Sequence, residues 1–456
     1  MIGIAGIIFG LALLVYLAYR GYSIIWVAPL SALVVALFGF GLNGKVLLDS
    51  YLNSYMSSLA GFAKGYFPLF FLGAVFGKMM EITGAAQSVA SLLARLFGSK
   101  RALLAVVLSA AVLCYGGVSQ FVAAFAIYPL AVPLYRSANL PRRLIPGAFC
   151  LGAFTFVMTA LPGSPSLNNI IAGKYFGTTL YAAPILGIVS GAILFFGGYF
   201  YLLWKQKSVV AAGEVFTEPE TAVASIEEKE LPNPVLSLLP MIVVVIALYI
   251  LTRKLSFDVT SGTVLALVLG NITTVLCNLD KLKQKDGDRD RDNGKKNFVL
   301  QALNAGGAGA IVATLNTAAA VGFGGVVRTV PGFKILTDYL LGLQASPLIS
   351  EGLTITILAG ATGSSAGGLG IALEALAPQY LQLAAGIGLS PETLHRIATV
   401  ASGGLDSLPH NGAVLTVLAI CGMTHKDSYN DIGVVTCVIP ILALFAIIVL
   451  GSLGIV

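Results

Sequence analysis

The stretch TALPGSPSLNN (residues 159–169) interrupts a long apolar segment with two prolines, a glycine and several polar side chains. A comparable interruption, GGLDSLPHN (residues 403–411), lies in the second half of the chain. Two shorter polar tips, YGGVSQ (residues 115–120) and TGSSAG (residues 362–367), also separate apolar segments. Each stretch alone also fits a surface turn, since Gly, Pro, Ser and Asn are ordinary loop residues. Four in matching positions favour broken helices inside a membrane protein, where they must be buried in protein or line a watery cavity.

The composition is that of a membrane protein. Of the 456 residues, 57% are hydrophobic and only 11% are charged, whereas a soluble domain carries about a quarter charged residues. Several apolar runs approach the roughly 20 residues that a transmembrane helix needs: 4–19, 24–42, 66–82, 235–251, 260–277 and 434–450. The first run lacks a basic leader and a cleavage site, so we expect a helix rather than a signal peptide. The sequence therefore predicts an all-α, multi-pass membrane protein.

Charge and cysteine patterns argue against other partners. The formal charge of +6 includes a dense cluster at residues 281–296, but that cluster mixes both signs between two apolar segments. It is expected to be a solvated loop, so no nucleic-acid partner is predicted. The five cysteines lie singly among apolar residues, without metal-ligand spacing. We expect them to be core residues, with no metal and no cofactor.

A polar and acidic stretch divides the chain into two similar halves. Residues 1–204 are predicted to form a first repeat, 205–233 a linker and 234–456 a second repeat. Each repeat is expected to hold about five transmembrane helices, one re-entrant hairpin and one broken helix. The hairpin is predicted at about 101–137 in the first repeat and about 346–385 in the second, and the broken helix at about 144–182 and about 391–422, respectively. Similar short motifs recur at offsets of 244 to 250 residues, in the same order in both halves. This drifting offset indicates an old duplication.

The distribution of basic residues predicts that the two repeats have opposite orientations. With the N-terminus outside, 18 of the 27 Lys and Arg residues face the cytoplasm and eight, including Lys174, Arg328 and Arg396, face outward. Lys78 stays within a span, and His395 and His425 are expected at span ends, in the interface. An odd number of spans per half inverts the second half. Inverted repeats with broken helices are typical of secondary transporters.

Ionisable residues near the breaks are candidates for coupling transport to protons. Asp406 and His410 fall inside the fourth break, and Glu374 lies in the apolar limb after the third. An ionisable group inside a membrane is a functional candidate because it is costly to keep there. A His and carboxylate set can exchange a proton at ordinary pH. Two structural alternatives remain open: Asp406 as a helix cap, and His410 as a hydrogen-bonded core residue.

Three segments resemble the gluconate permease family of the wider ion transporter superfamily. They are YGGVSQFVAAFAIYPLAVPL (115–134), TALPGSPSLNNIIAGKYFGTT (159–179) and GGLDSLPHNGAVLTVLAICGMTHKDSY (403–429). The resemblance runs over essentially the whole chain. The DSLPHNGAV segment (406–414) looks closest to members that handle short acids such as 3-hydroxybutyrate.

The resemblance implies proton-coupled import of gluconate or another small hydroxycarboxylate across the bacterial cytoplasmic (inner) membrane. It also implies an elevator mechanism, with a transport domain that slides against a scaffold, and a homodimer. The implied substrate site comprises Gly117, Ser119, Ser164, Ser166, Asn168, Ser364, Ser365, Asp406, Ser407, His410 and Asn411. The Ser-Leu-Asn and Pro-His-Asn tripeptides differ from the Ser-Asn-Thr signatures of the sodium-coupled branch, which leaves sodium coupling as an alternative.

Two other functional classes fit the sequence less well. A channel needs a continuous polar stripe, whereas polarity here is confined to four interruptions. An intramembrane enzyme would use His410 and Asp406, but no nucleophile elbow accompanies them. The sequence therefore predicts a secondary transporter and not an enzyme.

Overall fold

The computed structural model describes residues 2–20, 22–219, 231–279, 298–333, 335, 347–409 and 411–456. The helices of the first half are α1 (Ile2–Tyr19), α2 (Ile24–Phe40), α3 (Gly44–Asp49), η1 (Ser50–Tyr55), α4 (Met56–Ile82), α5 (Ala85–Phe97), η2 (Ser99–Arg101), α6 (Ala102–Tyr115), α7 (Gln120–Ser137), η3 (Arg142–Leu144), α8 (Ile145–Phe154), α9 (Phe156–Thr159), α10 (Leu167–Phe176) and α11 (Pro184–Ala211). Those of the second half are α12 (Pro234–Tyr249), η5 (Ile250–Lys254), α13 (Val259–Cys277), α15 (Phe298–Thr329), α17 (Pro347–Thr362), α18 (Ser365–Gly386), α19 (Pro391–Ser402), α20 (Gly412–Ile420), α21 (His425–Gly433), η6 (Val434–Val438) and α22 (Ile439–Ser452).

The prediction of an all-α, multi-pass membrane protein is confirmed. In the described part of the chain, six continuous helical segments are long and apolar enough to cross a membrane. They are Gly44–Ile82, Pro184–Ala211, Pro234–Lys254, Val259–Cys277, Val299–Thr329 and His425–Ser452. Many of their apolar side chains are exposed, including Phe200, Leu276 and Phe445. An apolar outer surface of this kind suits lipid as the surrounding solvent.

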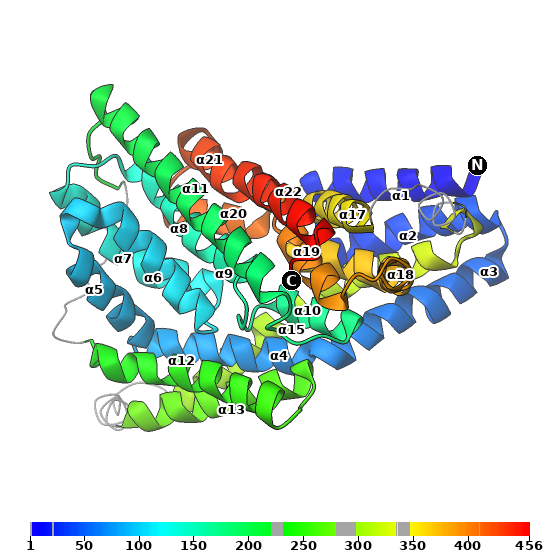
Figure 1. Cartoon of the computed structure of the whole chain (residues 1–456), viewed down its shortest axis with the longest axis horizontal. Helices are drawn as coiled ribbons and strands as arrows, with labels where there is room; N and C mark the ends of the chain where they lie inside the picture. The colour runs from blue at the N-terminus through cyan, green and yellow to red at the C-terminus, as the bar shows by residue number, and fades with distance from the viewer. Residues whose placement is uncertain are drawn as a thin grey trace, which may run out of the picture.

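Two long helices, α4 and α15, run along each other through the middle of the protein. The α1–α2 pair lies toward one end of these helices, where α2 packs against α15, and the α12–α13 pair lies toward the other, where α13 packs against α4 (Figure 1). The helices α5 to α11 and α17 to α22 lie together along one side of α4 (Figure 1). The close approach of α4 and α15 depends on Gly306, because a Cβ atom there would lie 2.9 Å from the Val75 backbone of α4.

Four interruptions of the helices lie where the sequence has its polar breaks. Residues 116–119 connect α6 to α7, and residues 363–364 connect α17 to α18, and the helices of each pair pack against each other. Residues 160–166 separate α9 from α10, and residues 403–411 separate α19 from α20. Three of these connections include a glycine with positive φ, at Gly117, Gly163 and Gly363. Residues with a Cβ atom rarely adopt that conformation, so glycine is needed there.

Candidate functional site

A cavity of about 610 Å³ lies between the helix interruptions and the two long central helices. Seven of the residues predicted for the substrate site line it: Gly117, Ser119, Ser164, Ser166, Asn168, Ser364 and Ser365. They come from the α6–α7 connection, from the break before α10 and from the α17–α18 connection. The fold thus brings together in one place three polar stretches that lie far apart in the sequence.

Three helices begin at this cavity, and each has a serine as its N-cap. The Oγ of Ser119 accepts from an N–H of α7 at 3.4 Å, that of Ser166 from α10 at 3.4 Å and that of Ser364 from α18 at 3.1 Å. One cap leaves other N–H groups of the first turn without an intrahelical partner. The N-terminus of a helix also carries a partial positive charge. Three such ends at one cavity make a site for an anion.

Neutral polar side chains complete this end of the cavity. Asn168 is buried and donates from Nδ2 to the Ser402 Oγ at 2.6 Å, while its Oδ1 lies 3.5 Å from the donating Ser365 Oγ. The Ser164 hydroxyl is buried and has no hydrogen-bond partner in the described part of the chain. An unpaired buried hydroxyl is costly, so a ligand that bonds to it gains that energy back. Ser164 is therefore the hydroxyl best placed to bind a ligand.

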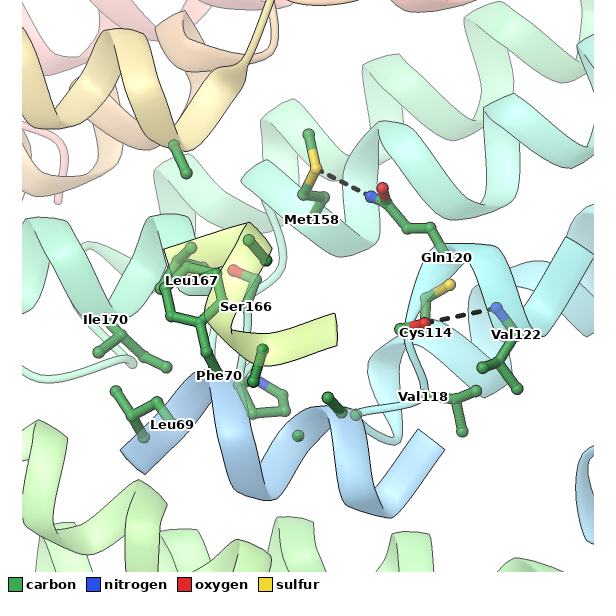
Figure 2. Close-up of a pocket in the computed structure, with 18 of the residues that line it drawn as sticks. Leu69, Phe70, Cys114, Val118, Gln120, Val122, Met158, Ser166, Leu167 and Ile170 are labelled. Atoms are coloured by element: carbon green, nitrogen blue, oxygen red, sulfur yellow. Dashed lines mark hydrogen bonds between the residues drawn. The ribbon is translucent and has the colours of Figure 1, made fainter. Parts of the chain in front are cut away.

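The opposite wall of the cavity is smooth and mostly apolar. It is formed by α4, with Leu69, Phe70 and Gly73, and by small residues of α15 from Ala305 to Ala313. Figure 2 shows α4 beneath the cavity, with Ser166 and Leu167 on one side and Gln120 on the other. The Gln120 amide points toward Met158 and donates to its Sδ at 3.1 Å (Figure 2). Polar groups therefore lie mainly on the side of the helix interruptions.

Lys78 also lines the cavity, and the site prediction did not include it. Its Nζ lies 2.6 Å from the Glu81 Oε1 on the same helix, so its charge is partnered. The sequence did carry a signal for it, because a lysine within a transmembrane segment is a functional candidate by default.

The fourth break does not line this cavity in the described structure. Asp406 and Ser407 are buried, and the Ser407 Oγ donates to the Asp406 Oδ1 at 3.0 Å. Asn411 caps α20 by accepting from Val414 N at 2.8 Å, and its Nδ2 donates to the Gly363 carbonyl at 2.9 Å. Asn411 thus connects the fourth break to the turn before α18. His410, predicted for substrate binding and proton coupling, lies outside the described residues.

Glu374 lines a second cavity, at the opposite end of α10 from the first. Its carboxylate accepts from the Tyr175 hydroxyl at 2.7 Å and from the Ser58 hydroxyl at 3.2 Å, and lies 3.4 Å from Arg328. The structure therefore separates Glu374 from the seven residues around the first cavity.

Arg396, counted among the outward-facing basic residues, and the neighbouring His395 both lie inside the protein rather than on its surface. Both side chains are fully buried on α19. The Asn169 Oδ1 accepts from Arg396 Nη1 at 3.1 Å and lies 3.2 Å from His395 Nε2, and the Ala182 carbonyl accepts from Arg396 Nη2 at 2.8 Å. These partners come from the first half of the chain, so the pair joins the two halves next to the break before α10. No group of metal-binding side chains occurs among the described residues.

Comparisons with known proteins agree with this architecture. Residues 2–279 match the family described as GntP family permease. The chain is 40% identical to the uncharacterized transporter YxjC of Bacillus subtilis (strain 168) over 480 aligned positions, which cover 98% of each protein. It is 32% identical to the Gnt-II system L-idonate transporter of Escherichia coli (strain K12) over 34% of this chain and 35% of that protein.

A solved transporter has a similar fold. The crystal structure of the YdaH transporter of Alcanivorax borkumensis superposes with a TM-score of 0.54 and 15% identity, covering 90% of this chain and 89% of that one. The likeness concerns the fold alone. The relatives are named as transporters or permeases, in agreement with the prediction of a transporter rather than an enzyme. The chain therefore belongs to the GntP family of permeases and is a multi-pass membrane transporter.

Proposed function

We propose that this permease imports a small hydroxycarboxylate by proton symport. The observation that carries the proposal is the convergence of the N-termini of α7, α10 and α18 on one cavity. Their free N–H groups and dipoles suit a carboxylate, and the hydroxyl of Ser164 suits a hydroxyl or carboxylate oxygen of the same ligand. Among the described lining residues no arginine contributes, and Lys78 is already paired. The anion is thus held without a fixed free cation, which favours its release.

A sugar acid is the substrate class that we favour. The cavity volume of about 610 Å³ lies within the range of roughly 300 to 1,000 Å³ usual for small-molecule sites. The relative named for a substrate is an L-idonate transporter, and L-idonate is a six-carbon hydroxy acid like gluconate. We therefore place gluconate and L-idonate before 3-hydroxybutyrate, the shorter acid suggested by the 406–414 segment.

We further propose that the two halves are inverted repeats, with residues 205–233 as the linker. Three helix contacts have a counterpart under the exchange of the two halves. Helix α2 packs against α15, and its counterpart α13 packs against α4. In the same way the contact of α6 with α8 matches that of α17 with α19, and the contact of α7 with α20 matches that of α18 with α10. Two of these three matched contacts join helices of opposite halves, as expected of a transporter with two-fold pseudosymmetry. The hairpins α6–α7 and α17–α18 would then enter the membrane from opposite faces.

The two unlike walls of the cavity support the proposal of an elevator mechanism. The polar groups belong to the hairpins and broken helices, whereas α4 and α15 present small or apolar residues such as Gly73, Gly309 and Ala313. A Cβ atom at Gly73 or Gly309 would meet no atom within 4 Å. A wall with few interlocking side chains opposes sliding least. We propose that the hairpins and broken helices carry the substrate along α4 and α15, and that the scaffold forms a homodimer in the bacterial cytoplasmic membrane.

Asp406 is the residue that we propose for proton coupling. It is a buried carboxyl that accepts a hydrogen bond from the Ser407 hydroxyl at 3.0 Å. An ionisable group buried inside a membrane protein is costly to keep, which makes Asp406 a candidate for binding and releasing the coupling proton. His410 and Glu374 remain further candidates, although Glu374 lies at the second cavity. Sodium symport is the alternative, since the oxygens of Asn168, Ser164 and Ser365 are neutral cation ligands of the kind that sodium accepts.

Uptake by the purified protein in proteoliposomes tests this function. Labelled gluconate, L-idonate and 3-hydroxybutyrate would be offered with an inward proton gradient or an inward sodium gradient. Proton symport predicts accumulation above the external concentration that needs the proton gradient and stops with a protonophore. Accumulation that needs only sodium would replace proton by sodium symport. Equilibration without accumulation would indicate uncoupled transport, by a channel or a uniporter, and overturn the proposal.

The variant Asp406→Asn tests the coupling residue. It should lose proton-driven accumulation while it still exchanges internal for external substrate, because exchange needs no net proton movement. Unchanged accumulation would exclude Asp406 as the proton carrier.

A further inference from the structure

The second cavity, of about 500 Å³, is lined by η1 and by four helices that also line the first: α4, α10, α15 and α18. Along α10, Asn168 lines the first cavity and Lys174 the second, which places them about 9 Å apart along the helix axis. Helices α4, α15 and α18 likewise line the first cavity with one part of their length and the second with another. The two cavities are therefore successive spaces along one interface.

A tight crossing of α15 and α18 lies between the two cavities. A Cβ atom at Gly324 would lie 3.0 Å from the Ile371 carbonyl oxygen, and one at Gly370 would lie 2.7 Å from Val321. These positions lie between the stretches of α15 and α18 that line the two cavities. The close packing of α15 and α18 thus separates the second cavity from the first along these two helices.

The second cavity already binds a carboxylate that belongs to the protein. Glu374 receives hydrogen bonds from Tyr175 at 2.7 Å and Ser58 at 3.2 Å, and its Oε1 lies 3.4 Å from Arg328 Nη2. Arg328 also donates from Nη1 to the Glu374 backbone carbonyl at 3.3 Å. Tyrosine, serine and arginine donors of this kind would bind a free carboxylate equally well.

The described lining residues carry one positive charge in excess. Lys174 and Arg328 oppose Glu374, and the other described lining residues are neutral. In the described part of the chain Lys174 pairs with no carboxylate. Its ammonium lies 4.6 Å from the centre of the Tyr66 ring instead. The cavity therefore holds one more cation than its internal carboxylate can neutralise.

We propose that the second cavity is an anion-binding antechamber, where a small carboxylate binds between Lys174 and Arg328 before it reaches the substrate cavity. Glu374 is the internal carboxylate that competes with the anion for Arg328. The charge distribution of the sequence predicts this face to be external, since Lys174 and Arg328 belong to the outward set. The identity of the anion rests on the proposed function, whereas the presence of an anion site does not.

The proposal predicts opposite effects for the two partners of the ion pair. Glu374→Gln removes the competitor and should strengthen anion binding in the antechamber. Arg328→Gln or Lys174→Gln removes a ligand and should weaken it. If the pair only holds α15 to α18, both substitutions should act in the same direction. Lys64→Gln is the matched control, because Lys64 is also in the predicted outward set and exposed on α4 but does not line the cavity.

Thiol labelling measures binding in the antechamber without requiring transport. Ser57 lines the cavity and is exposed, so Ser57→Cys should react with a charged, membrane-impermeant thiol reagent. The rate would be measured with increasing gluconate or acetate, and the protein without this substitution gives the background of the native cysteines. We expect the anion to slow labelling. Arg328→Gln should raise the half-protecting concentration by about tenfold or more, Glu374→Gln should lower it and Lys64→Gln should leave it unchanged.

Ser164→Ala separates the two cavities in this assay. It alters only the substrate cavity, so protection at Ser57→Cys should persist in that background. The antechamber would be overturned if Ser164→Ala abolished the protection, or if neither acid protected Ser57→Cys. It would also be overturned if Arg328→Gln and Glu374→Gln shifted the half-protecting concentration equally in the same direction. If protection occurs but no acid is taken up by proteoliposomes, the proposed function fails and the anion site stands. If uptake occurs without protection, the antechamber alone fails.

Discussion

Ser164→Ala should weaken substrate binding without harming the folded protein. The Ser164 hydroxyl lines the substrate cavity, is buried and has no partner in the described part of the chain. Its removal therefore breaks no hydrogen bond of the unliganded protein. A hydrogen bond to a charged group contributes about 1.5 to 3 kcal/mol, and each 1.4 kcal/mol changes a Kd about tenfold. The Kd for the transported acid should rise between about tenfold and about a hundredfold, while the Tm without ligand stays within about a degree or rises.

The assay is ligand-induced thermal stabilisation of the purified protein, titrated with the acid that the uptake experiment identifies. Ser31→Ala is the control, because the Ser31 hydroxyl is likewise buried without a partner in the described structure but lies on α2, away from the cavity. It should leave the Kd unchanged. A Ser164→Ala protein that binds the acid as tightly as the wild type would refute the assignment of this hydroxyl to the ligand.

Three further predictions concern the packing of α4 against α15, the buried Asn168 amide and the ion pair of Glu214 with Arg143. Gly306→Ala should cost about 1 to 3 kcal/mol by forcing α15 from α4, whereas Gly309→Ala, which faces open space, should be neutral or stabilising; equal losses of Tm would contradict the packing. Asn168→Ala should cost about 1 to 3 kcal/mol by removing two hydrogen bonds, and should weaken ligand binding as well; unchanged Tm and Kd values would exclude that role. Hydrogen bonds from Arg143 lower the pKa of Glu214, which lies beyond the end of α11, so this pair stabilises the protein above pH ~4.3 and loses its effect as the pH falls below it. Glu214→Gln should therefore lower the Tm at pH 7, with a loss of stability below ~1 kcal/mol, and this loss should shrink as the pH falls through the lowered pKa of Glu214. A loss that does not change with falling pH would argue against the ion pair.

The sequence predicted the helix interruptions well because their chemistry is local. A serine or asparagine that follows a glycine-rich or proline-rich turn and precedes an apolar run is an N-cap signal, and Ser119, Ser166, Ser364 and Asn411 all cap helices. The resemblance to the gluconate permease family predicted that these four residues lie at the site. Three of the four line the substrate cavity.

What the sequence did not predict depends on contacts between distant segments. Asp406 and Ser407 belong to a polar break, yet the packing of the 403–411 segment leaves them out of the lining of the cavity. Arg396 was assigned to the outer surface because charge counting cannot reveal that Asn169 and the Ala182 carbonyl bind its guanidinium in the interior. Glu374 was recognised as unusual, but its separation from the substrate cavity depends on how α15 crosses α18.

The most direct test of the central claim is a cryo-EM structure of the protein in lipid nanodiscs with the transported acid bound. The claim is that three helix N-termini and the Ser164 hydroxyl hold the substrate. The account predicts ligand density in the first cavity, with the carboxylate at the first-turn N–H groups of α7, α10 and α18. Density that instead places the carboxylate at Lys78 on α4, or outside this cavity altogether, would contradict it.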